Sequence, residues 1–506
     1  MRKLVTALVL VALPFFSHAQ SGYDIIINLK NCKDTTAYLT FYQFDKTYIK
    51  DTCTAIKNGK ILFKGKEKLP TGMYSLVGQQ KSILFDFFID ETNQKLELES
   101  NEFGNYGKDI KAVNSNLENE FFEYVRFIGN QNQEYSIAIS GQKSESKKDS
   151  TDFVQSKRKI LEDKLDTYEK VFIEKNKNTF IARVINLKKD KLLKDIPKAS
   201  NGRPDSLKVY QYFKKHYWDG VDFQEDAILR TPFFSKKMNI YLESVIFPHP
   251  DSISVSVNSI LDQTKQGSLM YKLLLNHFTY TFESSKKMGY DKVFVNLVDR
   301  YFKTGKAVGL YEDENILANI IKRSDKLKPL LIDQKAPELA MIRAEDGPRM
   351  LELGFENVKT SDELTKIFYD NYQELEKKFF KLETIEAKYT VLVFWDVDCG
   401  HCQKEIPILL EDYHKMLKDK IDVKFFSVYT QHDVAKYQKY IKEHNLDWIN
   451  VYDGAHYNNV TDRYDVYSTP VIYLLDKDKV IKAKRIGAAQ VREIIAMLEK
   501  AESTAK

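Results

Sequence analysis

The sequence predicts a multidomain protein with an N-terminal antiparallel β-sandwich, a central all-α domain and a C-terminal α/β domain. Its 506 residues, 43% of them hydrophobic, exceed what one core usually supports, because single cores seldom grow beyond about 250–300 residues. The hydrophobic pattern also changes twice, from short alternating runs to three- and four-residue spacing, and then to strands alternating with helices. We place the domain limits at 20–105, 106–332 and 333–506, after a separate segment at 1–19.

Residues 1–19 are typical of a secretory signal peptide. Arg2 and Lys3 precede a short apolar run, and the small residues Ser17 and Ala19 fit a signal peptidase site. The run falls short of the roughly 20 residues that a helix needs to span a bilayer. Cleavage after Ala19 is therefore favoured, and an uncleaved anchor is the alternative. We expect an exported protein in the periplasm, where cysteines can oxidise.

Residues 20–105 contain short alternating segments, such as Asp24–Leu29 and Ala37–Tyr42, which predict strands. Turn signals at Asn58-Gly59 and at Pro70-Thr71-Gly72 separate them, as in an antiparallel sandwich.

Two of the four cysteines, Cys32 and Cys53, lie about two strands apart in this region. A structural disulfide between them and a pair of buried free thiols are both compatible with the sequence. Four cysteines are too few for a scaffold held together by disulfides.

Residues 106–332 show the spacing of amphipathic helices, and prolines divide the region into several of them. One such face is formed by Leu161, Leu165, Tyr168 and Phe172. The net charge of the chain is only +5, so no one-signed field indicates nucleic acid as a partner.

Residues 333–506 alternate between strand and helix. A β-rich run at Thr390–Trp395 precedes a helical segment at Cys402–Leu417, and a hairpin and a final helix complete the region. This order predicts a mixed sheet that is covered on both faces.

The segment Cys399-Gly400-His401-Cys402 carries the candidate chemistry. Cys399 falls where a strand ends and a helix begins, and the positive end of a helix dipole stabilises a thiolate, the nucleophile in disulfide exchange. His401 adds to this stabilisation, whereas the negative charge of Asp398 should raise the pKa of the thiol. Cys402, one turn later, would be the resolving thiol.

A C-x-x-C pair can also be half of a zinc site or two inert core cysteines. Zinc would need two further ligands, and the nearby histidines, His414, His432, His444 and His456, occur singly. We therefore expect no metal and no other cofactor.

The segment Phe394–Pro407 resembles the active site of the thioredoxin superfamily, in particular the exported TlpA/ResA-like thiol-disulfide oxidoreductases. Ala336-Pro337 and Thr469-Pro470, which matches the cis-proline of the family, extend the resemblance over about residues 333–502. It implies a thioredoxin-like fold and a redox-active CxxC pair. The implied catalytic residues are Cys399, Cys402, His401 and Glu405, and the implied substrate-binding residues are Trp395, Gly400, Thr469 and Pro470.

The resemblance leaves three points open. Glu405 matches an acid that transfers protons or tunes the pKa of the thiols, but it could also be an exposed glutamate of a first helical turn. The family usually has Trp where this chain has Asp398, and Cys-Gly-His-Cys matches the motif of protein disulfide isomerase. The first two domains resemble uncharacterised β-rich and helical modules of exported Bacteroidetes proteins, which imply no activity.

We expect an enzyme that exchanges disulfides with protein substrates, and we favour a reductase over an oxidase or isomerase. Its partners would be protein thiols and disulfides and a membrane electron-transfer protein. The alternative is a non-catalytic substrate-binding or scaffold protein of the cell envelope with an incidental redox pair.

Overall fold

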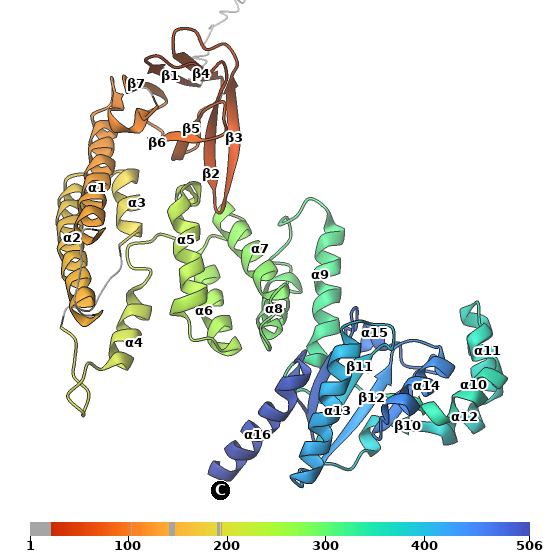
Figure 1. The fold of residues 1–506 in the computed structure, drawn as a ribbon. Helices are drawn as coiled ribbons and strands as arrows, with labels where there is room; N and C mark the ends of the chain where they lie inside the picture. The colour runs from red at the N-terminus through yellow and green to blue at the C-terminus, as the bar shows by residue number, and fades with distance from the viewer. Residues whose placement is uncertain (1–21, 103, 141–146, 190–192, 194, 506) are drawn as a thin grey trace, which may run out of the picture. The chain divides into compact units, whose positions relative to one another are not determined.

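The computed structural model describes residues 22–102, 104–140, 147–189, 193 and 195–505 (Figure 1). The predicted signal peptide lies outside these residues. The chain forms two compact units: the first runs to Ile246 and includes Gln263–Met270, and the second comprises Phe247–Asp262 and the chain from Tyr271 onward. Among the described residues, no helix is both long and apolar enough to cross a membrane. The predicted domain limits remain predictions.

The N-terminal region is β-rich, as predicted, and forms two four-stranded sheets in the orders β4-β1-β7-β8 and β3-β2-β5-β6. The second sheet is antiparallel throughout, whereas β7 pairs in parallel with β1 in the first. Alternation buries every second residue of β1, from Tyr23 to Leu29. The strands are β1 (Tyr23–Leu29), β2 (Ala37–Gln43), β3 (Lys46–Cys53), β4 (Lys60–Gly65), β5 (Gly72–Val77), β6 (Ile83–Ile89), β7 (Lys95–Ser100) and β8 (Lys111–Ala112).

The central region is helical, as predicted. Pro232 occupies the first turn of its helix, where the missing N–H costs no hydrogen bond. The helices are α1 (Asn116–Ser140), α2 (Lys147–Lys175), α3 (Phe180–Leu187), α4 (Ser206–His216), α5 (Pro232–Ile240), α6 (Pro250–Gln263), α7 (Leu269–Glu283), α8 (Asp291–Leu297) and α9 (Glu314–Leu327).

The C-terminal region is an α/β domain with a thioredoxin-like fold, which confirms the predicted fold class. Its seven-stranded sheet has the order β10-β9-β13-β12-β11-β14-β15. The central strand β11 pairs in parallel with β12 and antiparallel with β14. The strands are β9 (Ala340–Arg343), β10 (Phe379–Lys381), β11 (Tyr389–Trp395), β12 (Val423–Tyr429), β13 (Ile449–Tyr452), β14 (Val471–Asp476) and β15 (Ile481–Lys484).

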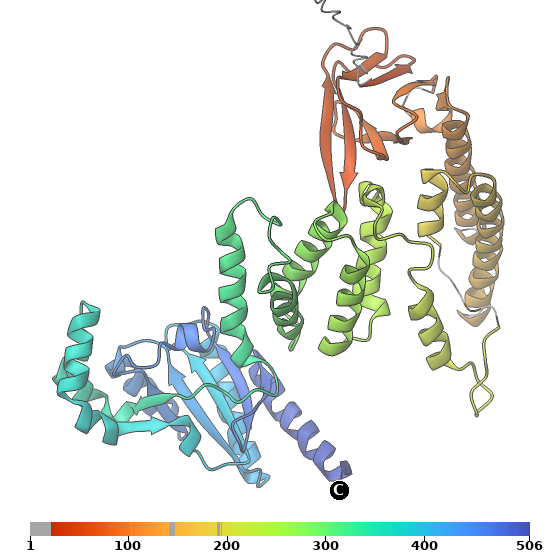
Figure 2. The same cartoon turned by 180° about the vertical axis from the view of Figure 1, so that it is seen from behind.

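Helices connect these strands and cover the sheet. They are α10 (Gly347–Leu353), α11 (Ser361–Asp370), α12 (Tyr372–Lys378), α13 (Cys402–Lys418), α14 (Val434–His444), α15 (Val460–Arg463) and α16 (Ala488–Ala505). Helices α10 to α12 fill the long stretch between β9 and β11 and lie toward the β10 end of the sheet (Figure 2).

All seven residues of β11 are buried, because hydrophobic cores cover both faces of the strand. Val391 and Val393 face the core that contains residues of α13, α14 and α16. Leu392 and Phe394 face the opposite core, to which α15 contributes. Such a strand shows a continuous apolar run rather than an alternating one. The sheet thereby fixes the position at which β11 ends and the candidate site begins.

Candidate redox site

The junction of β11 and α13 places Cys399 at a helix N-terminus. The Asp396 carbonyl accepts a 3.2 Å hydrogen bond from the Cys399 N–H. The Asp396 carboxylate accepts a 3.0 Å bond from the Asp398 N–H. These bonds form a tight turn between the last strand residue and Cys402, where α13 begins. The backbone N–H groups of such a first turn have no partner within the helix and are available to the Cys399 sulfur.

The two thiols of the pair differ in exposure. Cys399 is partly exposed and Cys402 is fully buried, and both are free thiols in the structure. The Cys402 N–H lies 3.5 Å from Cys399 Sγ, and the same sulfur lies 3.2 Å from the Thr469 carbonyl oxygen. The structure therefore brings Cys399, Cys402 and Thr469 together across 70 residues of chain.

The pKa values of the two thiols shift in opposite directions. Partial burial of Cys399 raises its pKa, but hydrogen bonds with Thr469, Cys402 and the His401 backbone outweigh this effect and lower it. Burial raises the pKa of Cys402 to about 12, and the neighbouring Cys399 acts in the same direction. At neutral pH Cys399 is therefore the more nucleophilic thiol.

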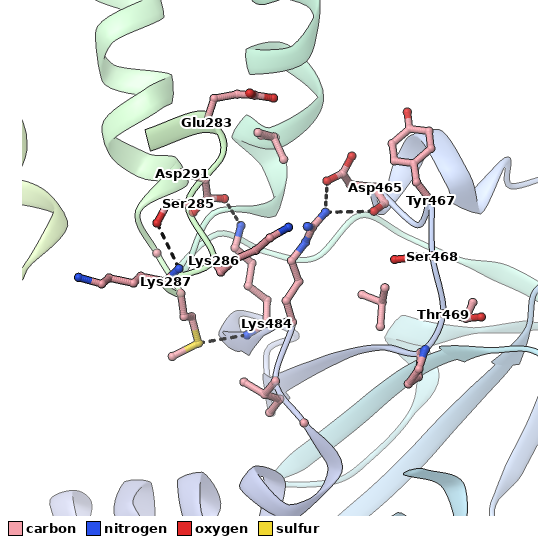
Figure 3. Close-up of a pocket in the computed structure, with 18 of the residues that line it drawn as sticks. Glu283, Ser285, Lys286, Lys287, Asp291, Asp465, Tyr467, Ser468, Thr469 and Lys484 are labelled. Carbon is pink, nitrogen blue, oxygen red and sulfur yellow. Dashed lines mark hydrogen bonds and ion pairs between the residues drawn. The ribbon is translucent and has the colours of Figure 1, made fainter. Parts of the chain in front are cut away.

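A polar pocket of about 560 Å³ opens beside this pair, and its lining includes His401, Glu405, Thr469 and Pro470 (Figure 3). The Thr469–Pro470 peptide bond is cis, as the sequence pattern implies. Gly400 is exposed and has open space where a side chain would stand. Four of the predicted catalytic and substrate-binding residues thus share one cavity.

Glu405 lies in the first turn of α13 and is half-buried. Its Oε2 accepts a 2.7 Å hydrogen bond from the N–H of Ala488, the first residue of α16. The carboxylate therefore stabilises the N-terminus of α16 at the same time as it lines the pocket.

The sequence predicts that the charge of Asp398 raises the pKa of the neighbouring thiol, and the structure adds a cation to this picture. The Asp398 side chain is exposed and forms an ion pair with Lys436 of α14, with Oδ1 and Oδ2 at 2.5 and 2.6 Å from Nζ. The cation offsets the negative charge beside Cys399. Sequence reasoning missed Lys436, which lies 38 residues away on an ordinary polar helix face.

The predicted substrate-binding role of Trp395 is wrong, because the side chain has no exposed surface. Its indole N–H donates a 2.7 Å hydrogen bond to Ser427 Oγ, and its ring packs edge-on against Tyr437 and Tyr440. Trp395 is a core residue that supports the strand end, and it cannot touch a substrate.

Cys32 and Cys53 are both free thiols in the structure. Cys53 ends β3 opposite Ala37 of β2, and Cys32 follows β1 in the other sheet. A disulfide between them stays a prediction. Among the described residues, no group of three or more His, Cys, Asp or Glu side chains is arranged to hold a metal ion.

Comparison with known proteins finds a family that resembles the region carrying these thiols. Residues 368–484 match the model of the AhpC/TSA family. The matched region, which includes both thiols, is thus similar to that family. Upstream of it, residues 23–146 match a domain of unknown function, DUF4369, and residues 173–320 match another, DUF5106.

Curated proteins similar to this chain include thiol-disulfide oxidoreductases. A thiol-disulfide oxidoreductase ResA of Bacillus cereus is 27% identical over 127 residues, which are 25% of this chain and 71% of that protein.

Two solved structures are similar as well. A domain of a possible thiol-disulfide isomerase from Cytophaga hutchinsonii is 30% identical, with a TM-score of 0.27, and the match covers 35% of this chain and 98% of that one. A thioredoxin-like protein from Bacteroides caccae is 16% identical, with a TM-score of 0.33, over 60% of this chain and 98% of that one.

Proposed function

We propose that this protein is a periplasmic thiol-disulfide oxidoreductase that reduces disulfides in protein substrates. One observation carries the proposal: a partly exposed Cys399 thiol of lowered pKa stands beside a buried Cys402 thiol whose pKa is raised to about 12. An attacking thiol must be ionised and accessible, and a resolving thiol must be held back until the mixed disulfide has formed.

The reaction follows from this arrangement. The Cys399 thiolate attacks one sulfur of the substrate disulfide, forms a mixed disulfide and releases the other substrate sulfur as a thiolate. Cys402 then loses its proton and attacks Cys399 Sγ, which releases the second substrate thiolate and closes the Cys399–Cys402 disulfide. Two electrons pass to the substrate, and a dithiol donor must later return two electrons to the pair.

We assign proton transfer at the thiols to His401 and Glu405. Both line the pocket beside the thiols, and a spacing of four residues places them on one face of a helical turn. Glu405 would accept the proton that Cys402 must lose before it attacks. Thr469, Pro470 and Gly400 would contact the substrate chain next to the reacting sulfur.

The direction and the location are part of the proposal. The predicted signal peptide supports export, and the similarity to the oxidoreductase ResA supports exchange chemistry there. We propose a membrane electron-transfer protein as the dithiol donor. N-terminal sequencing of the exported protein checks the location, because cleavage after Ala19 leaves Gln20 first.

Reduction of insulin disulfides tests the activity. The wild-type protein should turn over insulin with a chemical dithiol as donor, and Cys399→Ser should abolish turnover because it removes the nucleophile. Cys32→Ser/Cys53→Ser is the matched control, since it removes two thiols outside the site and should retain the rate. Equal turnover by Cys399→Ser and wild type would end the proposal.

The reduction potential of the Cys399–Cys402 couple tests the direction. A value clearly below the glutathione poise, about −220 to −260 mV, favours a reductase. A value at or above that range would contradict this direction and favour an oxidase or isomerase.

A further inference from the structure

The pocket beside the redox pair has a second wall that does not come from the AhpC/TSA-family region. One wall is the chain segment before the cis peptide bond, with Tyr467, Ser468 and Thr469. The other is the segment from Glu283 to Asp291, which joins α7 to α8 in the same compact unit. Figure 3 shows Ser285 and Lys286 on one side of the space and Ser468 and Thr469 on the other.

Buried ion pairs hold the two walls together. Lys484 at the end of β15 is only 5% exposed. Its ammonium pairs with Asp291 at the start of α8 and donates a 2.6 Å hydrogen bond to the Leu330 carbonyl. The Lys484 N–H also lies 3.5 Å from the Met288 sulfur of the joining segment. A buried lysine is stable in its charged form only when such partners replace the water that it loses. The contact between β15 and the start of α8 therefore depends on these particular residues.

A second link reaches the segment that carries the cis peptide bond. The Asp465 carboxylate is 1% exposed and pairs with Arg323 of α9 and with Arg485 after β15. Ion pairs thus connect both walls of the pocket to neighbouring elements, Asp291 to β15 and Asp465 to α9.

Each acidic side chain that lines the pocket already has an ion-pair or hydrogen-bond partner. Asp291 is paired with Lys484, Asp465 with two arginines, and Glu283 lies 3.5 Å from Arg323. Glu405 accepts the N–H of Ala488.

Lys286, in contrast to these acidic side chains, is exposed and forms no ion pair with a carboxylate among the described residues. Figure 3 shows its side chain extending into the pocket. The adjacent Lys287 also lines the pocket, but its side chain extends in the other direction. The Lys287 ammonium lies 5.3 Å from the centre of the Tyr290 ring. The unengaged charge inside this cavity is therefore positive and can attract an anion.

We propose that Lys286 binds a carboxylate of the substrate polypeptide, so that this protein selects disulfides flanked by acidic residues. The inference rests on the proposed exchange function and adds a substrate class to it. The acidic side chain would sit between the two walls while the target sulfur meets Cys399. The helical region thus supplies a specificity residue to the redox site.

Paired peptide substrates test this assignment. Two disulfide-bonded peptides that differ only in Glu or Gln beside the cysteine are reduced by the wild type, Lys286→Gln and Lys287→Gln. We expect the wild type to prefer the Glu peptide in kcat/KM by about two- to fivefold, as exposed ion pairs allow. Lys286→Gln should lose this preference, and the matched control Lys287→Gln should keep it. Lys286→Glu should reverse it in favour of a Lys peptide.

A binding measurement separates this inference from the exchange function. Fluorescent peptides with Ser in place of cysteine report affinity by anisotropy without any redox step. If the wild type binds the Glu peptide more tightly than the Gln peptide and Lys286→Gln does not, the inference holds even when no peptide is reduced. If both peptides bind and react equally well with the wild type, the assignment of Lys286 is overturned while the exchange function stands.

Discussion

The Asp398 carboxylate is bound to the Lys436 ammonium at 2.5 and 2.6 Å, directly beside Cys399, the nucleophile that we propose. The carboxylate that the sequence places next to the thiol is thus accompanied by a cation from α14. This relationship gives a first test of how the thiol is tuned.

Replacement of Lys436 with Gln should raise the pKa of Cys399, because Asp398 would then face the thiolate without its cation. The measurement is the pH dependence of iodoacetamide alkylation in a Cys402→Ser background. Lys436→Gln/Asp398→Asn should return the pKa toward that of the parent. An unchanged alkylation profile in Lys436→Gln would mean that Asp398 has no electrostatic influence on the thiol.

The parent protein should itself show two thiols of different reactivity. The pKa of Cys399 is lowered, so its alkylation rate should rise with pH and level off at a lower pH than for an ordinary cysteine, whose pKa is about 8.5. Cys402, with a pKa raised to about 12, should resist alkylation at neutral pH. Mass spectrometry of the reduced protein locates the label, and equal labelling of both cysteines at neutral pH would contradict the assignment.

Replacement of Glu405 with Gln separates proton transfer from helix capping. Gln keeps an oxygen that can accept the Ala488 N–H, so the unfolding free energy should fall by no more than about 1 kcal/mol. If Glu405 accepts the Cys402 proton, insulin reduction should slow by about tenfold or more. A normal rate in a stable Glu405→Gln protein would leave Glu405 only its structural role at α16.

Replacement of Asp465 with Asn should destabilise the second unit. It leaves Arg323 and Arg485 without their shared carboxylate, and loss of one partner of a buried pair costs about 3 kcal/mol or more when both are buried. The two arginines are partly exposed, so we expect about 2–3 kcal/mol in urea unfolding. Asn also tolerates the left-handed backbone at this position, where φ is 57°. Asp462→Asn, at an exposed ion pair with Lys326, is the control and should change stability far less.

The state of Cys32 and Cys53 is decided by thiol labelling of Cys399→Ser/Cys402→Ser. The structure has both as free thiols, which predicts labelling of both cysteines after unfolding without reductant. Labelling only after reduction would instead establish the disulfide that the sequence leaves open. The control is the same variant with Cys32→Ser, which should label once.

The sequence determined the fold classes, because their signals are local. Alternation of apolar and polar residues marks a strand, and three- and four-residue spacing marks a helix. The thiol pair could be placed at a helix N-terminus for the same reason, since β11 and α13 adjoin it directly. The parallel pairing of β1 with β7 lies beyond such signals, because it joins residues as distant in the chain as Asp24 and Lys95.

The surroundings of the thiols follow from the way distant parts of the chain pack together. Trp395 lies in a continuous apolar run, and a strand buried on both faces carries no periodicity to show that its last side chain points into a core. The sequence likewise carries no mark that Lys436 reaches Asp398, or that Lys286 lines the pocket beside His401 and Thr469. These contacts depend on packing between distant segments, whereas the position of Cys399 and Cys402 at a strand-to-helix junction depends on residues beside them in the chain.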